Sequence, residues 1–593
     1  MAMAAVVAVT MGCEGPALSP TVSDHPKRGG DLVAASWQEQ TSLLAAGITD
    51  SAPHAIAYEA PMAEGLIGRT AGGSVLPAGK LSDQFQPLLA TEVPTVENGD
   101  VKVSGSTMKV TYKLRQGVKW HDGKPFTSKD VADTANFYYL RYKEANPTPI
   151  LSTNGWDQIT SVDTPNANTA VVNFKSVYGP YLSLFSGTYG VLPSHLLQPT
   201  WAAGGDMTKT KLSVDLSPAN PSGFKGSGTW DKWLVGTGPF VFKEWVPGDH
   251  LTMVRNNSYW GRHTAYLDQI TVKFEPDIET QYSDVRTGTA QLGLDFRAGL
   301  LGPLGHVANL STQVVRDSGS EKLDFNLKNK YLADPTIRRA INMSIDKKKM
   351  VDRLLQGRTS IPPDTGICLG LAAWCSDPSI PVTKYDRKAA NSLLDAAGYK
   401  LRTVGPEASF RAFSDGTTIA LSLVTTAGNT QRDLQEAQIA SDLAAIGIKV
   451  KTPFKNPTAA QLFGSFAEGG VLYNHTFDMA QYANTVPGGD PDGWYSVFVC
   501  DQVPLATNGG LGLNDTQECN PALDAAFKAG RTTVAPAGRR QAYVAAANVL
   551  ARDLPEVALY QQITVIAYNR RLNGYAPATD SWMSSSSEWY LNS

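Results

Sequence analysis

The stretch Phe477–Tyr495 combines side chains that could bind a small molecule. It reads FDMAQYANTVPGGDPDGWY, an apolar start typical of a strand followed by a loop with amides, carboxylates and aromatic rings. Polar groups and aromatics on a loop after a strand are typical of ligand clefts. The alternative is an exposed turn with two core aromatics. The ligand contacts predicted from this stretch are Tyr482, Asn484, Asp490, Trp494 and Tyr495, with Trp494 as a stacking wall.

A second candidate site is Ser36–Gln40, SWQEQ, directly after the first expected strand. Trp37 could stack on a ligand, and the carboxylate of Glu39 could pair with an ammonium group. For Gln38 and Gln40 we favour a solvated turn.

Motifs of common enzyme sites are absent from the sequence. It contains no HExxH, GxSxG or CxxC, and the glycines before Lys80 do not have P-loop spacing. The eight histidines are scattered, and His121 lies in a predicted structural corner, where we expect it to be bound within a turn. We therefore expect no enzyme, no cofactor and no metal site.

The composition is that of an ordinary soluble globular protein of several domains. Of 593 residues, 42% are hydrophobic and 18% charged, with a net charge of −3, which gives no basic surface for nucleic acid. The twelve Trp and twenty-two Tyr suit a cleft that stacks on ligands. No apolar run in the body reaches the ~18 residues that a spanning helix needs.

The N-terminus carries a short apolar run, Ala2–Val9, followed after two residues by Gly12-Cys13. This order is similar to the end of a lipoprotein signal, although no Lys or Arg precedes the run and Thr10 stands where such signals usually carry Leu. We predict that Cys13 is lipidated and anchors the chain to a membrane. The alternative is an N-terminal tail with an unrelated cysteine.

The other four cysteines form two pairs that are local in sequence. Cys368 and Cys375 flank a short loop, and Cys500 and Cys519 flank a loop rich in Gly and Asn. Local pairs in loops suit disulfides in an oxidising compartment. A zinc site is the rival interpretation, but neither pair is CxxC and no His lies close by.

The expected secondary structure differs between the first and second halves of the chain. Tyr112–Val131 predicts a strand, a turn at Asp122-Gly123 and a helix capped near Thr127. From about residue 322 strands and helices alternate. The strands expected there are Leu323–Leu327, Ile419–Val424, Gly447–Val450 and Val557–Ala567, and the helices are Pro335–Ile345, Asp386–Ala397, Gln431–Ile446 and Arg539–Leu550.

Several long motifs resemble one known family. The most specific is LRQGVKWHDGKPFTSKDV at Leu114–Val131. In order, the others are VLPSHLL from Val191, GTGPFVFKEW from Gly236, RNNSYW from Arg255, LDFNLKN from Leu323, PTIRRAINMSID from Pro335 and YDRKAANSLLDAAGY from Tyr385. This set is similar to the family 5 extracellular solute-binding proteins, the oligopeptide- and dipeptide-binding receptors of ABC importers.

The resemblance implies an α/β, two-lobed periplasmic-binding-protein-like fold with hinge-linked lobes around a ligand cleft. It places an anchor and tether in residues 1–28 and lobe I in 29–74, 226–321 and 561–593. It places an inserted subdomain in 75–225 and lobe II in 322–560, with hinge crossings near Leu323–Leu327 and Val557–Ala567. These boundaries are expectations.

The resemblance also implies a function. It predicts an extracytoplasmic receptor, monomeric and anchored on the outer face of the cell membrane, that passes a peptide to the transmembrane subunits of an ABC permease. Peptide receptors of the family carry an aspartate before a GDPD-like element, and this aspartate pairs with the ligand ammonium. Here Gly489–Asp492 matches the element, but Asn484 or Thr485 stands at the place of the aspartate. An oligosaccharide ligand, a sensor without import and a secreted hydrolase remain alternatives.

Overall fold

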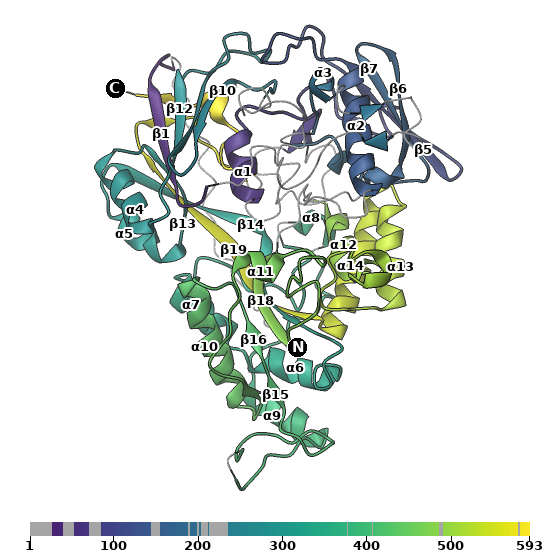
Figure 1. Cartoon of the computed structure of the whole chain (residues 1–593), viewed down its shortest axis with the longest axis vertical. Coiled ribbons are helices and arrows are strands. Elements are labelled where there is room, and N and C mark those ends of the chain that lie inside the picture. Colours follow the sequence, from purple (N-terminus) through teal and green to yellow (C-terminus); the bar gives the residue numbers. More distant parts are fainter. Residues whose placement is uncertain are drawn as a thin grey trace, which may run out of the picture.

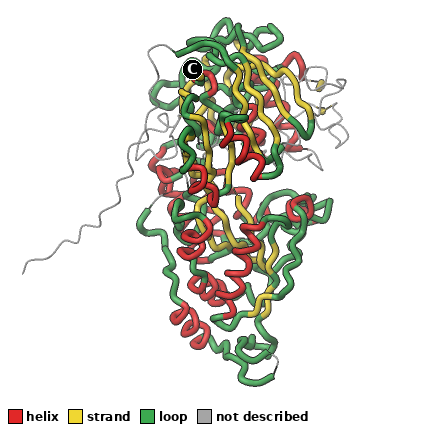
Figure 2. The backbone as a smooth tube through the Cα atoms, turned by 90° about the vertical axis from the view of Figure 1, so that its left-hand side faces the viewer, coloured by secondary structure: helices red, strands yellow, loops and turns green. Residues whose placement is uncertain are grey.

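The chain folds into an upper and a lower lobe, which long strands join (Figures 1 and 2). The computed structural model describes residues 26–39, 52–69, 85–143, 155–187, 190–197, 201–202, 211–212, 235–369, 371–375, 377–405, 407–484, 490–578 and 581–592. The predicted α/β class with two lobes is confirmed. Cys13 lies outside the described residues.

A nine-stranded sheet runs through both lobes. Its two longest strands, β14 and β19, are antiparallel neighbours from Leu310↔Asn569 to Asp324↔Glu556. In spatial order the strands are β10 (Phe240–Val246), β11 (His250–Arg255), β12 (Gln269–Phe274), β1 (Asp31–Ser36), β13 (Leu292–Phe296), β19 (Glu556–Asn569), β14 (Leu310–Phe325), β18 (Met479–Asn484) and β16 (Leu423–Val424). The strands between the lobes are therefore continuous with the core of each lobe.

Strand β14 is much longer than the predicted Leu323–Leu327. Its register against β19 shifts between Arg316 and Ser320, so the alternation of apolar and polar residues that marks a strand is interrupted there. The predicted strand Ile419–Val424 is also different, because it divides into β15 and β16, which pair with different strands. The carboxylate of Asp478 accepts hydrogen bonds from the Ser422 N–H and hydroxyl at 2.7 and 2.8 Å, at the division point.

The upper lobe carries a four-stranded sheet with helix α2 (Ser128–Lys143) beside it (Figure 1). The predicted capped helix is confirmed, because Asp130 accepts a hydrogen bond from the Thr127 N–H at 2.6 Å. His121 is bound in a turn, as predicted, and accepts a hydrogen bond at Nδ1 from the Gly236 N–H at 3.2 Å. The strands, in spatial order, are β4 (Val101–Ser104), β5 (Thr107–Lys113), β7 (Thr169–Phe174) and β6 (Ile159–Asn166).

The lower lobe packs helices on the sheet end that β14, β18 and β16 form. Helix α6 (Pro335–Ser344) has Pro at its start and Asp334 as its N-cap, and it buries Ile337 and Ile341. Each such side chain stabilises the fold by about 1.5–3 kcal/mol on full burial. The other helices of this lobe are α7 (Lys347–Leu354), α9 (Arg387–Ala396), α10 (Thr430–Ala444) and α11 (Ala459–Phe463). The short helix α8 (Ala372–Cys375) packs instead against α14 (Pro536–Asp553).

A helical segment follows the candidate ligand loop and lies below α2 in Figure 1. It consists of α12 (Tyr495–Phe498), α13 (Pro521–Arg531) and α14 (Pro536–Asp553). The Gly179 N–H donates to the Arg531 carbonyl at 2.6 Å. A Cβ at Gly179 would lie 2.1 Å from the Thr533 carbonyl oxygen, so only glycine fits this approach. This segment, numbered within the predicted lobe II, therefore contacts the predicted inserted subdomain.

The remaining elements are short. The helices are α1 (Ala52–Glu59), α3 (Ser194–Leu197), α4 (Ile278–Thr287) and α5 (Leu301–Gly305). The two-stranded pairs are β2 (Ile67–Arg69) with β3 (Phe85–Pro87), β8 (Trp201–Ala202) with β9 (Lys211–Leu212), β15 (Ala420–Leu421) with β17 (Lys449–Val450), and β20 (Leu572–Asn573) with β21 (Tyr590–Leu591). No helix of the described ranges is both long and apolar enough to cross a membrane.

Candidate ligand-binding site

Strand β18 leads into the predicted ligand loop. It pairs with β14 from Ser320↔Asn484 to Phe325↔Met479, and its burial decreases toward the end, where Asn484 is half-buried. Within the described part of the chain the Asn484 side chain has no hydrogen-bond partner. Residues 485–489, including Thr485, lie outside the described residues. Asn484 is thus an available amide at the end of the strand that precedes the loop.

Asp490, where the described chain resumes, is held by a buried arginine. Arg539 donates from Nη1 to Oδ2 at 2.8 Å and from Nη2 to Oδ1 at 2.6 Å. Asp490 Oδ1 also accepts the Asp492 N–H at 2.9 Å, and Asp490 is only 7% exposed. Two-point pairing of this kind fixes both partners geometrically. The structure therefore gives Asp490 a supporting contact, and its predicted ligand contact remains a prediction.

Asp492 connects this loop to the predicted inserted subdomain. The Tyr178 hydroxyl donates to Oδ2 at 3.1 Å, and Arg531 Nε lies 3.2 Å from Oδ1. Burial raises the pKa of Asp492 to about 6, against the opposing charge of Arg531. Asp492 thereby joins residues far apart in sequence.

The two aromatic residues of the loop differ in exposure. Trp494 is fully buried and stacks on Phe498 at a centroid distance of 5.9 Å. Tyr495 is half-buried, with the Arg531 guanidinium 3.9 Å from its ring centroid. A pocket of about 470 Å³ opens beside Tyr495 and Tyr178, at the boundary between the subdomain and the helical segment. Trp494 occupies a core position in this structure. Its stacking on a ligand stays a prediction.

Trp37 and Glu39 contact strands and turns of the upper lobe. Trp37 is 37% exposed and its Nε1–H donates to Asp295 Oδ2 at 2.7 Å. Glu39 accepts from Trp245 Nε1 at 2.8 Å and from the Gly248 N–H at 3.0 Å. The carboxylate of Glu39 therefore has two donors already, whereas the ring of Trp37 remains accessible.

Tyr482 does not face solvent. It is 5% exposed, and its hydroxyl oxygen lies 2.7 Å from Asp324 Oδ2 and 2.8 Å from Asp515 Oδ2. These contacts fix the end of strand β18, two residues before Asn484.

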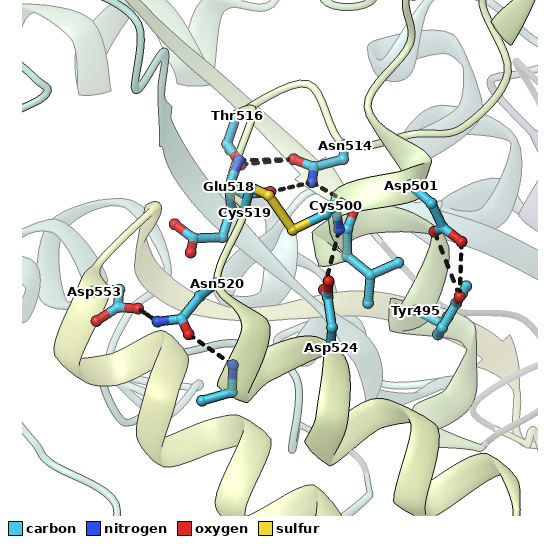
Figure 3. The surroundings of a disulfide bond; sticks show 12 residues. Tyr495, Cys500, Asp501, Asn514, Thr516, Glu518, Cys519, Asn520, Asp524 and Asp553 are labelled. Atoms are coloured by element: carbon cyan, nitrogen blue, oxygen red, sulfur yellow. Dashed lines mark hydrogen bonds between the residues drawn. A yellow bond between two sulfur atoms is a disulfide. The ribbon is translucent and has the colours of Figure 1, made fainter.

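Both predicted disulfides are confirmed. The Cα–Cα distances are 5.4 Å for Cys368–Cys375 and 4.5 Å for Cys500–Cys519. Figure 3 shows the second bridge. Beside it the Cys500 N–H donates a hydrogen bond to Asp524 at 3.1 Å, and the Thr516 hydroxyl donates one to Asn514 Oδ1 at 3.1 Å. The bridges close the segment that carries Trp374, on α8, and the loop that carries Asp515.

The sequence interpretation missed the arginines that support the site. Arg539, Ala542, Tyr543, Ala546 and Leu550 lie on one face of α14, and all are at most 8% exposed. A cation on an otherwise apolar helix face is a signal of a buried ion pair, and it was present in the sequence. In the described residues, no group of three or more His, Cys, Asp or Glu could hold a metal ion.

Comparison with known proteins places this geometry among solute receptors. The family model of bacterial extracellular solute-binding proteins, family 5 (middle), matches residues 84–503. The oligopeptide-binding protein AppA of Bacillus subtilis is 24% identical over 562 residues, which are 93% of this chain and 89% of AppA.

Solved structures match over nearly the whole chain. The structure of AppA from Bacillus subtilis in complex with a nonapeptide has a TM-score of 0.70 at 22% identity, and the match covers 96% of this chain and 100% of AppA. The structure of NikZ from Campylobacter jejuni in complex with Ni(L-His) has a TM-score of 0.71 at 21% identity and covers 94% and 99%. The two-lobed fold is thus shared with receptors whose bound molecules differ.

Proposed function

This chain belongs to family 5 of the bacterial extracellular solute-binding proteins, and we propose that it captures oligopeptides and delivers them to the transmembrane subunits of an ABC importer. The observation that carries the proposal is the match of the family model over residues 84–503. The name of the oligopeptide-binding protein AppA supports peptides as the ligand class. No catalytic step is needed, because closure of the lobes and burial of the ligand supply affinity.

We place the ligand between the two lobes, against the end of β18. Asn484 supports this placement, because its half-buried amide has no partner among the described residues. Trp37 offers an accessible ring at the end of β1. An available amide and an accessible aromatic ring also suit a neutral sugar, so oligosaccharides are the second candidate ligand class. The lobe boundaries predicted from the sequence form part of this proposal.

We further propose that the receptor works as a monomer held at the outer face of the cell membrane through lipid on Cys13. The sequence around Cys13 supports the anchor, and the family description supports an extracellular location.

Mass spectrometry of molecules released from the purified receptor tests the proposed function. Co-purifying peptides would support it, and oligosaccharides alone would replace the peptide proposal with the sugar one. Turnover of a candidate substrate by the pure protein would contradict a receptor without catalysis.

A further inference from the structure

Five polar side chains form a buried charged cluster in the lower lobe. Lys322 and Asp324 lie on the same face of β14, Tyr482 on β18, Glu556 on β19, and Asp515 on the loop between Cys500 and Cys519. All five are at most 5% exposed. The proposed ligand capture does not use this cluster.

One ammonium group in the cluster faces three carboxyl groups. Lys322 Nζ lies 2.7 Å from Asp324 Oδ2 and 3.3 Å from Glu556 Oε2. The opposite oxygen of Glu556 accepts the Gly366 N–H at 3.1 Å. Two further titratable groups lie close by: the buried hydroxyl of Tyr473, near Asp515 and Lys322, and the imidazole of His475, whose Nδ1 lies 3.0 Å from the backbone carbonyl oxygen of Asp515. If every carboxyl group were ionised, the cluster would bury an excess of negative charge, which is strongly unfavourable.

The hydroxyl of Tyr482 shows where a proton is needed. Its oxygen lies 2.7 Å from Asp324 Oδ2 and 2.8 Å from Asp515 Oδ2. A hydroxyl has one proton to donate, so both contacts are hydrogen bonds only if one carboxyl group donates a proton to Tyr482. Two ionised carboxylates at these distances would leave one of them against the hydroxyl oxygen with no proton between them.

The neighbours of the two aspartates decide which one is protonated. Asp324 Oδ2 also accepts a hydrogen bond from Lys322 at 2.7 Å, which favours its ionised form. Asp515 forms no ion pair within the described ranges. Oδ1 of Asp515, like Oδ1 of Asp324, has no hydrogen-bond partner there, so the Lys322 contact is what distinguishes the two aspartates. An unpartnered carbonyl oxygen of a neutral acid is less costly than an unpartnered oxygen of a buried carboxylate.

We propose that Asp515 is a proton-binding site: the folded protein holds one proton on Asp515, which donates to Tyr482, while Tyr482 donates to Asp324. The proton joins the disulfide-closed loop to β14 and β18, two residues before Asn484. Burial, followed by the charge of Asp324, raises the pKa of Asp515 well above its ordinary value, against the opposing charge of Lys322. Release of the proton would place two carboxylates around one hydroxyl group and push the loop away from the strands.

The sign of the pH dependence follows from this assignment. The pKa of Asp515 is higher in the folded than in the unfolded chain, so the folded chain binds more protons between the two values. Its contribution to stability is therefore fully present below the unfolded pKa of about 3.9 and is lost as pH rises toward the folded pKa. The contact between the disulfide-closed loop and the end of β18 therefore contributes most to stability at acidic pH, and this contribution falls as pH rises.

Infrared spectroscopy of the full chain at pH 8 tests the proposal without any variant. Aspartate labelled with ¹³C separates Asp carboxyl bands from Glu bands, and Asp492, with a pKa of about 6, is ionised at this pH. We expect a carbonyl stretch of a protonated aspartic acid, lost in Asp515→Asn and kept in Asp501→Asn, an exposed carboxylate of the same loop. Absence of the band in the wild-type protein, or its persistence in Asp515→Asn, overturns the proposal.

Denaturant unfolding between pH 5 and pH 8 provides the second measurement. The folding equilibrium constant of the wild-type protein should fall relative to that of Asp515→Asn by up to about tenfold per pH unit. The amide of the variant can still donate to Tyr482 but does not titrate. Parallel pH profiles overturn the proposal. If the variant does not fold, the labelled wild-type spectrum alone decides.

Discussion

Arg539 and Asp490 form a two-point ion pair inside the protein, with N–O distances of 2.6 and 2.8 Å and no exposure of the arginine. The Arg539 guanidinium also lies 4.6 Å from the ring centroid of Trp374, in the loop that the Cys368–Cys375 bridge closes. One side chain of α14 therefore holds both the ligand-loop element and a disulfide loop. Asp490 connects to the proposed ligand site through the chain that follows β18.

Removing one member of this pair should destabilise the protein strongly. In Arg539→Met the Asp490 carboxylate stays buried without its cation, which costs about 3–5 kcal/mol. Chemical denaturation measures the change in the free energy of unfolding. Arg540→Met is the matched control, because Arg540 is half-exposed and lies 3.5 Å from Asp377, a contact worth at most about 1 kcal/mol. Equal losses for the two variants would contradict the structural role of Arg539.

The two disulfides should stabilise the chain to different extents. The loop between Cys500 and Cys519 spans 19 residues and that between Cys368 and Cys375 spans 7. Loop-closure entropy predicts losses of about 3 kcal/mol and about 2.5 kcal/mol when each pair is replaced by alanine. Thermal unfolding of the two double variants measures these losses, and mass analysis after thiol labelling verifies the bridges. Free thiols in the oxidised wild-type protein would contradict the pairing.

Lys347 should make stability rise with pH in the alkaline range. Burial lowers the pKa of this lysine to about 8, against the opposing charge of Asp364. The unfolded chain therefore binds more protons between pH 8 and the ordinary lysine pKa of about 10.4, and stability increases with pH there. Lys347→Met should remove this increase. Lys348→Met, at an exposed neighbour whose side chain is 76% accessible, should keep it. Denaturation at several alkaline pH values distinguishes the two.

The residue at position 484 should determine whether the receptor prefers peptides with a charged N-terminus. Asn484→Asp adds a carboxylate at the end of β18 and should strengthen binding of peptides with free N-termini over acetylated ones, because a charged partner pairs more strongly with an ammonium. Asn484→Ala is the matched variant and should weaken both peptide forms by about 0.5–1.5 kcal/mol. Calorimetric titration measures the affinities. Unchanged affinity in both variants, with the fold intact, would place the ligand elsewhere.

Cys13 should determine membrane attachment. In Cys13→Ser the lipid acceptor is lost, so the receptor should move from the membrane fraction into the medium. Fractionation of cells that express each form provides the measurement. A wild-type protein that is already soluble without the change would rule out the anchor.

Elements with strong local signals could be predicted from the sequence. The cap at Asp386 predicted α9, and Pro335 with the apolar face behind it predicted α6, each within one or two residues. The length of strand β14 was underestimated, because its irregular register near Ser320 breaks the alternation of apolar and polar residues that marks a strand.

The sequence could predict which loop holds the candidate site, but not which residues contact one another there. The loop after β18 combines the right residue types, but their partners come from distant segments, such as Arg539 for Asp490 and Tyr178 for Asp492. Local patterns contain no information about such pairings. Both disulfides were predictable because each joins cysteines that are close in sequence.

Direct titration of the wild-type receptor with two ligand classes tests whether it captures peptides. The titrants are a pool of short peptides and a set of short neutral oligosaccharides, each at low and high salt. We expect saturable binding of peptides and no binding of the oligosaccharides. Binding of oligosaccharides with no response to any peptide would contradict this expectation.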